Sequence, residues 1–279
     1  MRRTIGACLA GATMALAGCG GGGTAASAAA PPADRALSDQ AVLGEKIFAD
    51  TTLSASGRQS CASCHDPAFA HSPANALAVQ LGGPNGDLQG SRKTPGIRYL
   101  ATNLPFFFDS EGTPVGGFFW DGRAANFAAQ ATARRRSSPT SPTTTSACRA
   151  TRDRGLCQRA DLAQRADLAQ RGDLCGAFKV PSLRNVALRQ AFFHNGRFTT
   201  LKDALTFYVQ RDTNPEKWYP RTADGSALKF DDLPPEYRAN VNTSEAPYDR
   251  GRGDRPALTD AEIDDVIAFL RTLSDGYAP

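Results

Sequence analysis

The sequence is poor in several residue types, and each shortage narrows what the protein can be. Methionine occurs only twice, as Met1 and Met14, and histidine only three times. Both methionines lie near the start, so the rest of the chain has no thioether side chain that could bind a metal. The net charge is only +4 and no basic stripe is interleaved with aromatics, which argues against a nucleic-acid partner. Few segments alternate apolar and polar residues, so we predict a mostly α protein with long irregular loops.

Long apolar runs are missing as well. Residues 5–17 form an apolar stretch that follows Arg2 and Arg3 and is too short to span a bilayer. This pattern is typical of an export signal. The stretch ends in Leu-Ala-Gly-Cys, which resembles the signal of bacterial lipoproteins and makes Cys19 the lipid-bearing residue. An ordinary secretory signal cut nearby is the alternative.

An export signal predicts the compartment in which the mature chain is found. We predict a signal peptide over residues 1–18 and a flexible Gly- and Ala-rich tether over residues 19–36. The protein is then expected in the periplasm, held to a membrane by its lipid. In such an oxidising compartment Cys157 and Cys175 could close a disulfide, which leaves Cys148 as the odd thiol.

The chain carries one strong motif, Cys61-Ala62-Ser63-Cys64-His65. Two thiols at this spacing form thioethers with the two vinyl groups of one haem, and the adjacent imidazole then ligates the iron. A bare C-x-x-C also suits a zinc half-site or a thioredoxin-like pair, but the trailing histidine, the export signal and the absence of a second C-x-x-C argue against both. We therefore expect one covalently bound haem c, with His65 as an axial iron ligand.

The sixth iron ligand is the central question, because it decides whether haem iron transfers electrons or activates oxygen species. No methionine remains to serve, which speaks against a simple His/Met electron carrier. The options left are His71, His194 or no protein ligand, and an open position admits peroxide. His71 lies only six residues after His65, a separation that makes the opposite face of the ring hard to reach.

Capping residues and periodicity predict several helices. They cover residues 38–49, opened by Ser38; residues 121–132; residues 200–210, opened by Thr199 or Thr200; and a final helix after the capping box Thr259-Asp-Ala-Glu262. Residues 158–174 repeat the string QRADLA. We interpret this repeat as an expanded surface loop between two cysteines.

Further segments stand in a characteristic order around the haem motif. They are L-G-E-K-I-F at 43–48, T-P at 94–95, F-W-D-G-R-A at 119–124, G-A-F-K-V-P-S-L-R-N at 176–185, F-H-N-G at 193–196 and F-L-R-T-L at 269–273. Together they resemble the bacterial di-haem cytochrome c peroxidase family, including its MauG-like members. The resemblance implies two cytochrome c-like domains, here residues 37–132 and 176–279, with a disrupted low-complexity segment over residues 133–175.

The resemblance also implies roles for single residues. In the family the first haem binds peroxide, the second supplies electrons and the tryptophan of W-D-G-R lies between them, so Trp120 is a candidate electron relay as well as a core aromatic. Gln130 falls at the position of a distal-pocket glutamine, with an exposed helical glutamine as the alternative. Tyr208 falls at the distal ligand of the second haem, which is methionine in typical peroxidases and tyrosine in MauG-like ones. Alternatively, its ring packs beside Leu201 and Leu205.

The chain departs from the family pattern in its middle. It has one C-x-x-C-H motif where the family has two, and the catalytic glutamate expected soon after Gln130 is missing. Residues 138–151 correspond to the family's sequence read one base out of frame, which suggests an internal deletion with a local frameshift. Lys93 replaces the asparagine that binds the family's inter-haem calcium, and an ammonium repels a cation. The sequence thus speaks against a second haem and against calcium.

These observations lead to three candidate functions. The first is a periplasmic haem peroxidase that reduces hydrogen peroxide with electrons from a small cytochrome or a cupredoxin, impaired by loss of the second haem. The second is a mono-haem electron-transfer protein. The third, favoured by Tyr208, is MauG-like oxidation of a protein side chain. In each of them the protein supplies orientation and electrostatics, while the haem carries the redox chemistry.

Overall fold

The computed structural model describes residues 37–132, 153–163 and 171–277. The chain divides into two units, residues 1–42 and residues 43–279, and the second holds everything discussed below. Cys19, Cys148 and the segment interpreted as frameshifted lie outside the described residues. Within the described ranges, every helix is too short or too polar to span a bilayer.

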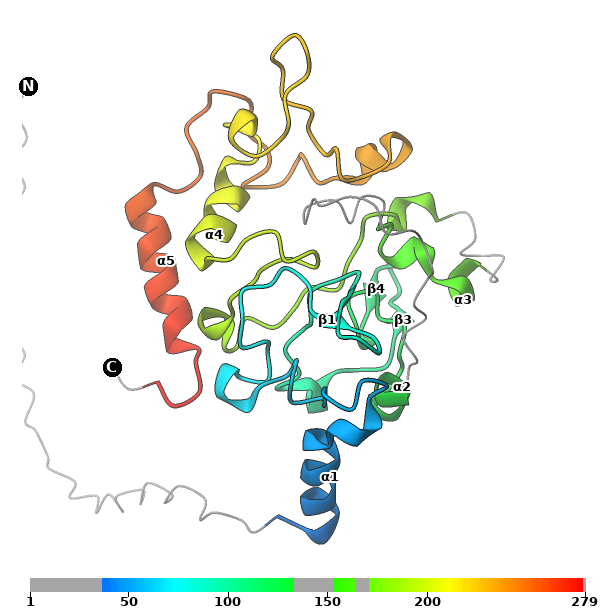
Figure 1. The fold of residues 1–279 in the computed structure, drawn as a ribbon. Helices are drawn as coiled ribbons and strands as arrows, with labels where there is room; N and C mark the ends of the chain where they lie inside the picture. Colours follow the sequence, from blue (N-terminus) through cyan, green and yellow to red (C-terminus); the bar gives the residue numbers. More distant parts are fainter. Residues whose placement is uncertain (1–36, 133–152, 164–170, 278–279) are drawn as a thin grey trace, which may run out of the picture. The chain divides into compact units, whose positions relative to one another are not determined.

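Regular structure in the described residues is mostly helical, as the sequence predicts (Figure 1). The helices are α1 (Asp39–Ala49), α2 (Phe127–Thr132), α3 (Ala160–Ala163), α4 (Leu201–Gln210) and α5 (Asp260–Thr272). The strands are β1 (Leu81–Gly82), β2 (Leu88–Gln89), β3 (Phe107–Phe108) and β4 (Pro114–Val115). They pair as two small antiparallel hairpins, β1 with β2 and β3 with β4. Short 3₁₀ turns and irregular loops make up most of the remainder, so the site is built largely on loops.

Helices α4 and α5 lie side by side and form the main apolar core (Figure 1). Thr200 caps α4 by accepting a hydrogen bond from the Asp203 N–H, and Thr259 and Glu262 form the predicted capping box of α5. The core itself contains Val186, Phe192, Ala204, Val209, Ile263, Ile267 and Leu270. This core fixes the loop that precedes α4, where His194 lies.

The chain contains an internal repeat, and each copy consists of two short stretches with the same sequence pattern and backbone conformation. The stretches of the first repeat are residues 92–99 and 118–124, and those of the second repeat are residues 178–185 and 192–198. Each begins with x-K-x-P-x-x-R and ends with F-F-x-x-G-R. Positive φ angles recur at equivalent positions: Tyr99 62° and Asn185 58°, Phe119 66° and Phe193 62°, Gly122 63° and Gly196 66°. In both repeats an isolated β-bridge closes the F-F-x-x-G-R turn.

The two repeats bind each other reciprocally through their backbones. The Lys93 N–H donates to the His194 carbonyl at 2.7 Å, and the Lys179 N–H donates to the Trp120 carbonyl at 2.8 Å. Each lysine therefore bonds to the residue after the two phenylalanines of the opposite turn. This exchange joins the haem-motif half of the chain to the half that carries α4 and α5.

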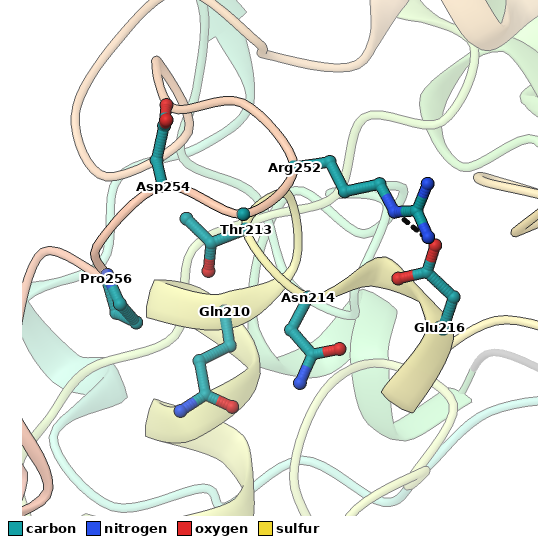
Figure 2. Close-up of a pocket in the computed structure, with 8 residues that line it drawn as sticks. Gln210, Thr213, Asn214, Glu216, Arg252, Asp254 and Pro256 are labelled. Atoms are coloured by element: carbon teal, nitrogen blue, oxygen red, sulfur yellow. Dashed lines mark ion pairs between the residues drawn. The ribbon is translucent and has the colours of Figure 1, made fainter.

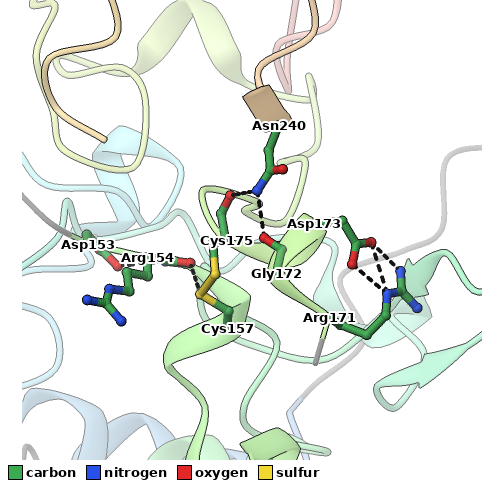
Figure 3. The surroundings of a disulfide bond; sticks show 9 residues. Asp153, Arg154, Cys157, Arg171, Gly172, Asp173, Cys175 and Asn240 are labelled. Carbon is green, nitrogen blue, oxygen red and sulfur yellow. Dashed lines mark hydrogen bonds and ion pairs between the residues drawn. A yellow bond between two sulfur atoms is a disulfide. The ribbon is translucent and has the colours of Figure 1, made fainter. Parts of the chain in front are cut away.

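A disulfide stabilises the connection between the repeats (Figure 3). Cys157 and Cys175, the pair that the sequence suggests, are joined with an S–S distance of 2.12 Å and a Cα–Cα distance of 4.9 Å. The Asn240 side-chain amide donates to the Gly172 carbonyl at 2.7 Å and to the Cys175 carbonyl at 3.0 Å. The loop that follows the disulfide therefore enters the second repeat from a fixed point.

Two expectations from the sequence need correction. The helix expected over residues 121–132 begins only at Phe127, because Gly122 and the bridge of the preceding turn hold residues 121–124 out of helical geometry. The repeat over 158–174 is not a surface loop at its ends, since Leu162 and Leu174 are only 4% and 5% exposed. Their leucines bury there because the disulfide returns the chain to the core. Residues 164–170 lie outside the described part of the chain.

Candidate haem-binding site

The C-x-x-C-H motif forms one tight turn. The Cys61 carbonyl accepts hydrogen bonds from the N–H of Cys64 at 3.2 Å and from the N–H of His65 at 3.0 Å. Cys61 is exposed and Cys64 is half-buried. Such a turn presents both thiols and the imidazole on neighbouring positions, which is what attachment of one porphyrin requires.

The orientation of His65 is set by a backbone carbonyl. Its Nδ1 lies 3.1 Å from the carbonyl oxygen of His71, and a carbonyl only accepts, so Nδ1 carries the proton. The neutral ring then has its lone pair on Nε2, which is the tautomer suited to ligate iron. The loop reaches this position because Ala70 and His71 both adopt positive φ, at 53° and 56°. The described residues therefore fit a haem c held at Cys61, Cys64 and His65.

The backbone carbonyl of His71 contacts His65 Nδ1, and the iron would be ligated at the other ring nitrogen. The Nδ1 of the His71 ring accepts a hydrogen bond from Arg98 Nε at 3.3 Å. His71 thus orients the proximal ligand, and this role agrees with the short sequence separation between the two histidines.

The segment from Lys93 to Ile97 joins the haem loop to Trp120. The Ile97 N–H donates to the same His71 carbonyl at 3.3 Å. At the other end the Lys93 carbonyl accepts a hydrogen bond from Trp120 Nε1 at 2.7 Å. Trp120 is 9% exposed, so it is a buried aromatic whose indole is fixed in orientation. This position is compatible with both roles expected for it.

A buried ion network holds the W-D-G-R turn. Arg92 pairs with Asp121 at 2.8 Å and with Asp153, and Arg123 also pairs with Asp121 at 2.8 Å. The side chains of Arg92, Asp121 and Asp153 are 8–13% exposed. Removal of one partner from such a buried network leaves an uncompensated charge, which is strongly destabilising. The network therefore positions the turn that carries Trp120.

His194 is held by stacking. Its ring lies 3.7 Å from the Phe178 ring, centroid to centroid, with an interplanar angle of 10°. Burial lowers the pKa of His194 well below its usual value, and the charge of nearby Asp153 opposes this shift only in part. The ring is therefore neutral at physiological pH.

Gln130 and Tyr208 lie away from this group. Gln130 is half-buried in α2, the helix whose Phe127 ring packs 4.9 Å from Phe118 of the W-D-G-R turn. The ring of Tyr208 contacts Phe193 at 5.3 Å and Tyr248 at 6.2 Å and remains 42% exposed. Since its ring is only partly covered, Tyr208 is not a simple core residue of α4. None of the described ring contacts or hydrogen bonds joins it to the C-x-x-C-H loop.

Calcium does not fit at the position implied for it. Lys93 is only 4% exposed and its Nζ donates to the Thr94 carbonyl at 3.3 Å. Burial, aided by the charge of Arg189, lowers the pKa of Lys93 to about 7. The Lys93 side chain offers no oxygen ligand to calcium, and the positive charge of the half-buried Arg189 repels a divalent ion. Among the described residues, no three His, Cys, Asp or Glu side chains come together as a metal site.

A separate pocket lies beyond the end of α4 (Figure 2). It has a volume of about 440 Å³, and Glu216 and Arg252 form an ion pair of 2.6 Å at its side. The Thr213 hydroxyl is buried there and has no hydrogen-bond partner among the described residues. None of the residues singled out in the sequence lines this pocket.

Sequence reasoning missed the groups that position the site. The His71 carbonyl, the Arg92–Asp121–Asp153 network and the reciprocal lysine bonds were not foreseen. A search for internal repeats would have found x-K-x-P-x-x-R followed by F-F-x-x-G-R twice. That search would have placed Lys93 and Lys179 as equivalent residues.

Comparisons with known proteins agree with this site. Residues 38–152 match the family model "Di-haem cytochrome c peroxidase". The chain is 44% identical over 106 residues to the methylamine utilization protein MauG of Paracoccus denitrificans, and 34% identical over 93 residues to the cytochrome-c peroxidase IdrP2 of Denitromonas iodatirespirans. These matches cover 37% and 33% of this chain but only 26% and 21% of the relatives, so the chain spans about a quarter of the length of the curated relatives it matches.

A solved structure extends the likeness over most of the chain. The diheme peroxidase BthA from Burkholderia thailandensis superposes with a TM-score of 0.70, covers 87% of both chains and is 26% identical. The local matches in sequence and the broad match in fold agree on one family. On this evidence the chain is similar to di-haem cytochrome c peroxidases and MauG, in sequence over residues 38–152 and in fold over most of its length.

Proposed function

We propose that this protein is an exported haem peroxidase that reduces hydrogen peroxide with electrons from a small cytochrome or a cupredoxin. The observation that carries the proposal is the His65 tautomer, fixed by the His71 carbonyl at 3.1 Å. In this tautomer the lone pair is on Nε2, the atom that would ligate iron, and the sequence after Met14 has no methionine to serve as a second ligand. The haem, when bound, supplies the chemistry that breaks the O–O bond. The relatives named above include a cytochrome-c peroxidase and a diheme peroxidase.

The chain's own residues have distinct roles in this proposal. His65 holds the haem, and its hydrogen bond to the His71 carbonyl raises the basicity of Nε2. Trp120 lies one hydrogen bond from Lys93 and relays electrons toward the haem. Gln130 helps to line the distal pocket. The domains we propose, residues 37–132 and 176–279, are cytochrome c-like, and the second is a remnant without its own haem motif.

The test uses protein made in a host with working cytochrome maturation. We expect intact mass to show one added haem per chain and EPR of the ferric protein to show a high-spin component. Peroxide should be consumed when a reduced small cytochrome is supplied. Trp120→Phe should lower kcat with little change in KM for peroxide, while Trp218→Phe, at the other buried tryptophan, should leave kcat near wild type. A six-coordinate low-spin iron that ignores peroxide would overturn the proposal and favour the electron carrier.

A MauG-like oxidase is the alternative favoured by Tyr208. The tyrosine is partly exposed and burial raises its pKa, so the phenol stays protonated at neutral pH. If Tyr208 takes part in side-chain oxidation, Tyr208→Phe should abolish peroxide-driven oxidation of a protein substrate and leave cytochrome oxidation intact. Equal loss of both activities would contradict this alternative.

We also propose that the protein is a periplasmic lipoprotein. The support is the apolar stretch ending in Leu-Ala-Gly-Cys at residues 16–19. Cys19→Ser should release the protein from membranes into the soluble periplasmic fraction, and labelled palmitate should no longer be incorporated. Unchanged membrane attachment in the variant would exclude the anchor.

A further inference from the structure

The residue that contacts the proposed iron ligand has a backbone conformation that needs support from elsewhere. His71 has a φ angle of 56°, in the left-handed region that residues other than glycine rarely adopt. Its carbonyl lies 3.1 Å from His65 Nδ1 and also accepts a hydrogen bond from the Ile97 N–H at 3.3 Å. Such a conformation persists only where the surrounding structure fixes it. The groups that hold His71 therefore also hold the hydrogen bond on His65.

Arg98 binds the side chain of the same residue. Its Nε donates to His71 Nδ1 at 3.3 Å, while the preceding residue, Ile97, binds the His71 carbonyl. His71 is thus fixed from one segment at two points, one on its backbone and one on its ring. Without the Arg98 bond, backbone contacts alone would have to hold the left-handed conformation.

Asp275, which lies beyond the end of α5, fixes the Arg98 guanidinium. The two side chains form an ion pair, and the Tyr99 hydroxyl donates to the same carboxylate. The Asn185 amide donates to it at 3.0 Å, and the Asp275 N–H donates to the Asn185 side chain at 2.8 Å. An exposed ion pair by itself contributes little. This carboxylate, however, is bound by residues of both repeats, so it offers Arg98 a fixed partner.

The second repeat lacks an equivalent connection. Arg184 occupies the position of Arg98 in x-K-x-P-x-x-R. It is exposed, its guanidinium lies 5.6 Å from the centre of the Tyr99 ring, and it forms no ion pair within the described ranges. In the part of the chain that the structure describes, the arginine of this motif is thus tied to a carboxylate in the repeat that contacts the C-x-x-C-H loop and not in the other.

We propose that Arg98 and Asp275 are positioning residues that act through His71 to keep the hydrogen bond on the iron ligand His65. An acceptor on the Nδ1–H of an iron-bound imidazole makes the ring a stronger donor to the iron, which favours the ferric state. The end of the chain, 177 residues after Arg98, would thereby tune the haem. This inference rests on iron ligation by His65, which is part of the proposed function, and not on peroxide turnover.

The first test compares two haem-loaded variants of the full chain. Arg98→Met removes the guanidinium, and Arg184→Met makes the same change at the equivalent position of the second repeat. We expect Arg98→Met, but not Arg184→Met, to shift the haem reduction potential to more positive values, because His65 donates less electron density to the iron. The iron–histidine stretching band of the five-coordinate ferrous protein should move to lower frequency in Arg98→Met alone.

Two changes at His71 separate the hydrogen bond from the ring that accepts it. Asparagine tolerates positive φ, and its Oδ1 is bonded to Cγ as Nδ1 is in histidine, so His71→Asn can still accept from Arg98. His71→Ala offers no acceptor. We expect His71→Asn to keep the wild-type potential and His71→Ala to shift it as Arg98→Met does. This pair also keeps the proposal testable if Arg98→Met folds poorly.

Asp275→Ala tests the far end of the network. It should shift the potential in the same direction as Arg98→Met and by no larger amount. The double variant Arg98→Met/Asp275→Ala should have the potential of Arg98→Met alone, because the effects of residues that act through one another do not add.

A potential in Arg98→Met equal to that of Arg184→Met would overturn the proposal. Equal shifts in His71→Asn and His71→Ala would do the same, as would shifts of Arg98→Met and Asp275→Ala that add in the double variant. A protein that ignores peroxide still has a measurable potential, so these outcomes are independent of peroxidase activity. Absence of haem from the wild-type protein, seen by intact mass, would contradict the proposed function and this inference together.

Discussion

The two repeats have the same backbone and different side-chain surroundings. Both place a lysine N–H on the carbonyl of the opposite turn, at 2.7 and 2.8 Å. The ammonium of Lys179 donates to two acceptors, whereas that of Lys93 is buried and donates to one. The residues that follow the two phenylalanines also have different partners. Trp120 donates a hydrogen bond to the Lys93 carbonyl, whereas the His194 ring stacks on the Phe178 ring. The shared hydrogen bonds build the scaffold, and the side chains that the scaffold carries differ between the two repeats.

The glycines of the two turns provide the largest test of this comparison. A Cβ on Gly196 would lie 2.1 Å from the Ala78 backbone oxygen, whereas one on Gly122 would meet the Phe106 side chain at 2.7 Å. We expect Gly196→Ala to lower the free energy of unfolding by about 2–5 kcal/mol, from a positive-φ penalty and a backbone clash. Gly122→Ala should cost less, because a side chain moves more easily than backbone.

The control for both glycine variants is Gly225→Ala. Gly225 also has positive φ, at 84°, but nothing lies within 4 Å of the place that an added methyl group would occupy. This variant isolates the conformational penalty, about 1–2 kcal/mol. Urea unfolding of the haem-loaded proteins gives all three values. If Gly196→Ala cost no more than Gly225→Ala, the close contact between the second repeat and residue 78 would be absent.

The two tryptophans give the next largest effect. Trp120 and Trp218 are 9% and 8% exposed, but only Trp120 Nε1 has a partner, whereas Trp218 Nε1 is buried without one among the described residues. Tryptophan-to-phenylalanine variants remove the same volume at both sites. Trp120→Phe should therefore cost about 1–3 kcal/mol more than Trp218→Phe, because it leaves the Lys93 carbonyl unpaired. Denaturant unfolding measures the difference, and equal costs would contradict the hydrogen bond.

Acid should weaken the contact that joins both repeats to the end of α5. Hydrogen bonds from Tyr99 and Asn185, with the charge of Arg98, lower the pKa of Asp275 to about 2. A carboxyl whose pKa is lower in the folded state contributes stability above its unfolded pKa of about 4 and loses it as pH falls toward 2. Asp275→Asn should remove this part of the pH dependence between pH 4 and pH 2.

The matched control is Asp264→Asn, which breaks the exposed ion pair with Lys202 at 2.7 Å and touches neither repeat. Surface pairs of this kind contribute little. The acid unfolding curve of Asp264→Asn should therefore keep the wild-type slope. A wild-type slope in Asp275→Asn as well would show that Asp275 does not join the repeats.

Removal of calcium should have no effect on the stability of the protein. Because Lys93 and Arg189 repel a divalent cation, EGTA should leave the melting temperature and the optical spectrum of the haem-loaded protein unchanged, and added calcium should do the same. A melting temperature that falls with EGTA and recovers with calcium would show that calcium binds despite these two side chains.

Sequence reasoning succeeded where local chemistry decides. The capping box at Thr259 and Glu262 and the cap at Thr200 gave the starts of two helices to within a residue, because caps are satisfied by neighbours in the chain. The haem motif likewise depends on spacing alone. The prediction of a helix from residue 121 was wrong, because residues 118–124 form an F-F-x-x-G-R turn. A β-bridge holds the positive φ angles of this turn, and sequence periodicity does not show that bridge.

The sequence by itself predicted the candidate haem attachment residues and the main helices, since these follow from residue identity and spacing. Only the tertiary structure decided which carbonyl contacts His65, which ion pairs hold the turn that carries Trp120, and that Lys93 is buried. The physical reason is that a hydrogen-bond partner or a counter-charge is chosen by distance in space. In this protein those distances are set by two similar turns, far apart along the chain, that bind each other's backbone.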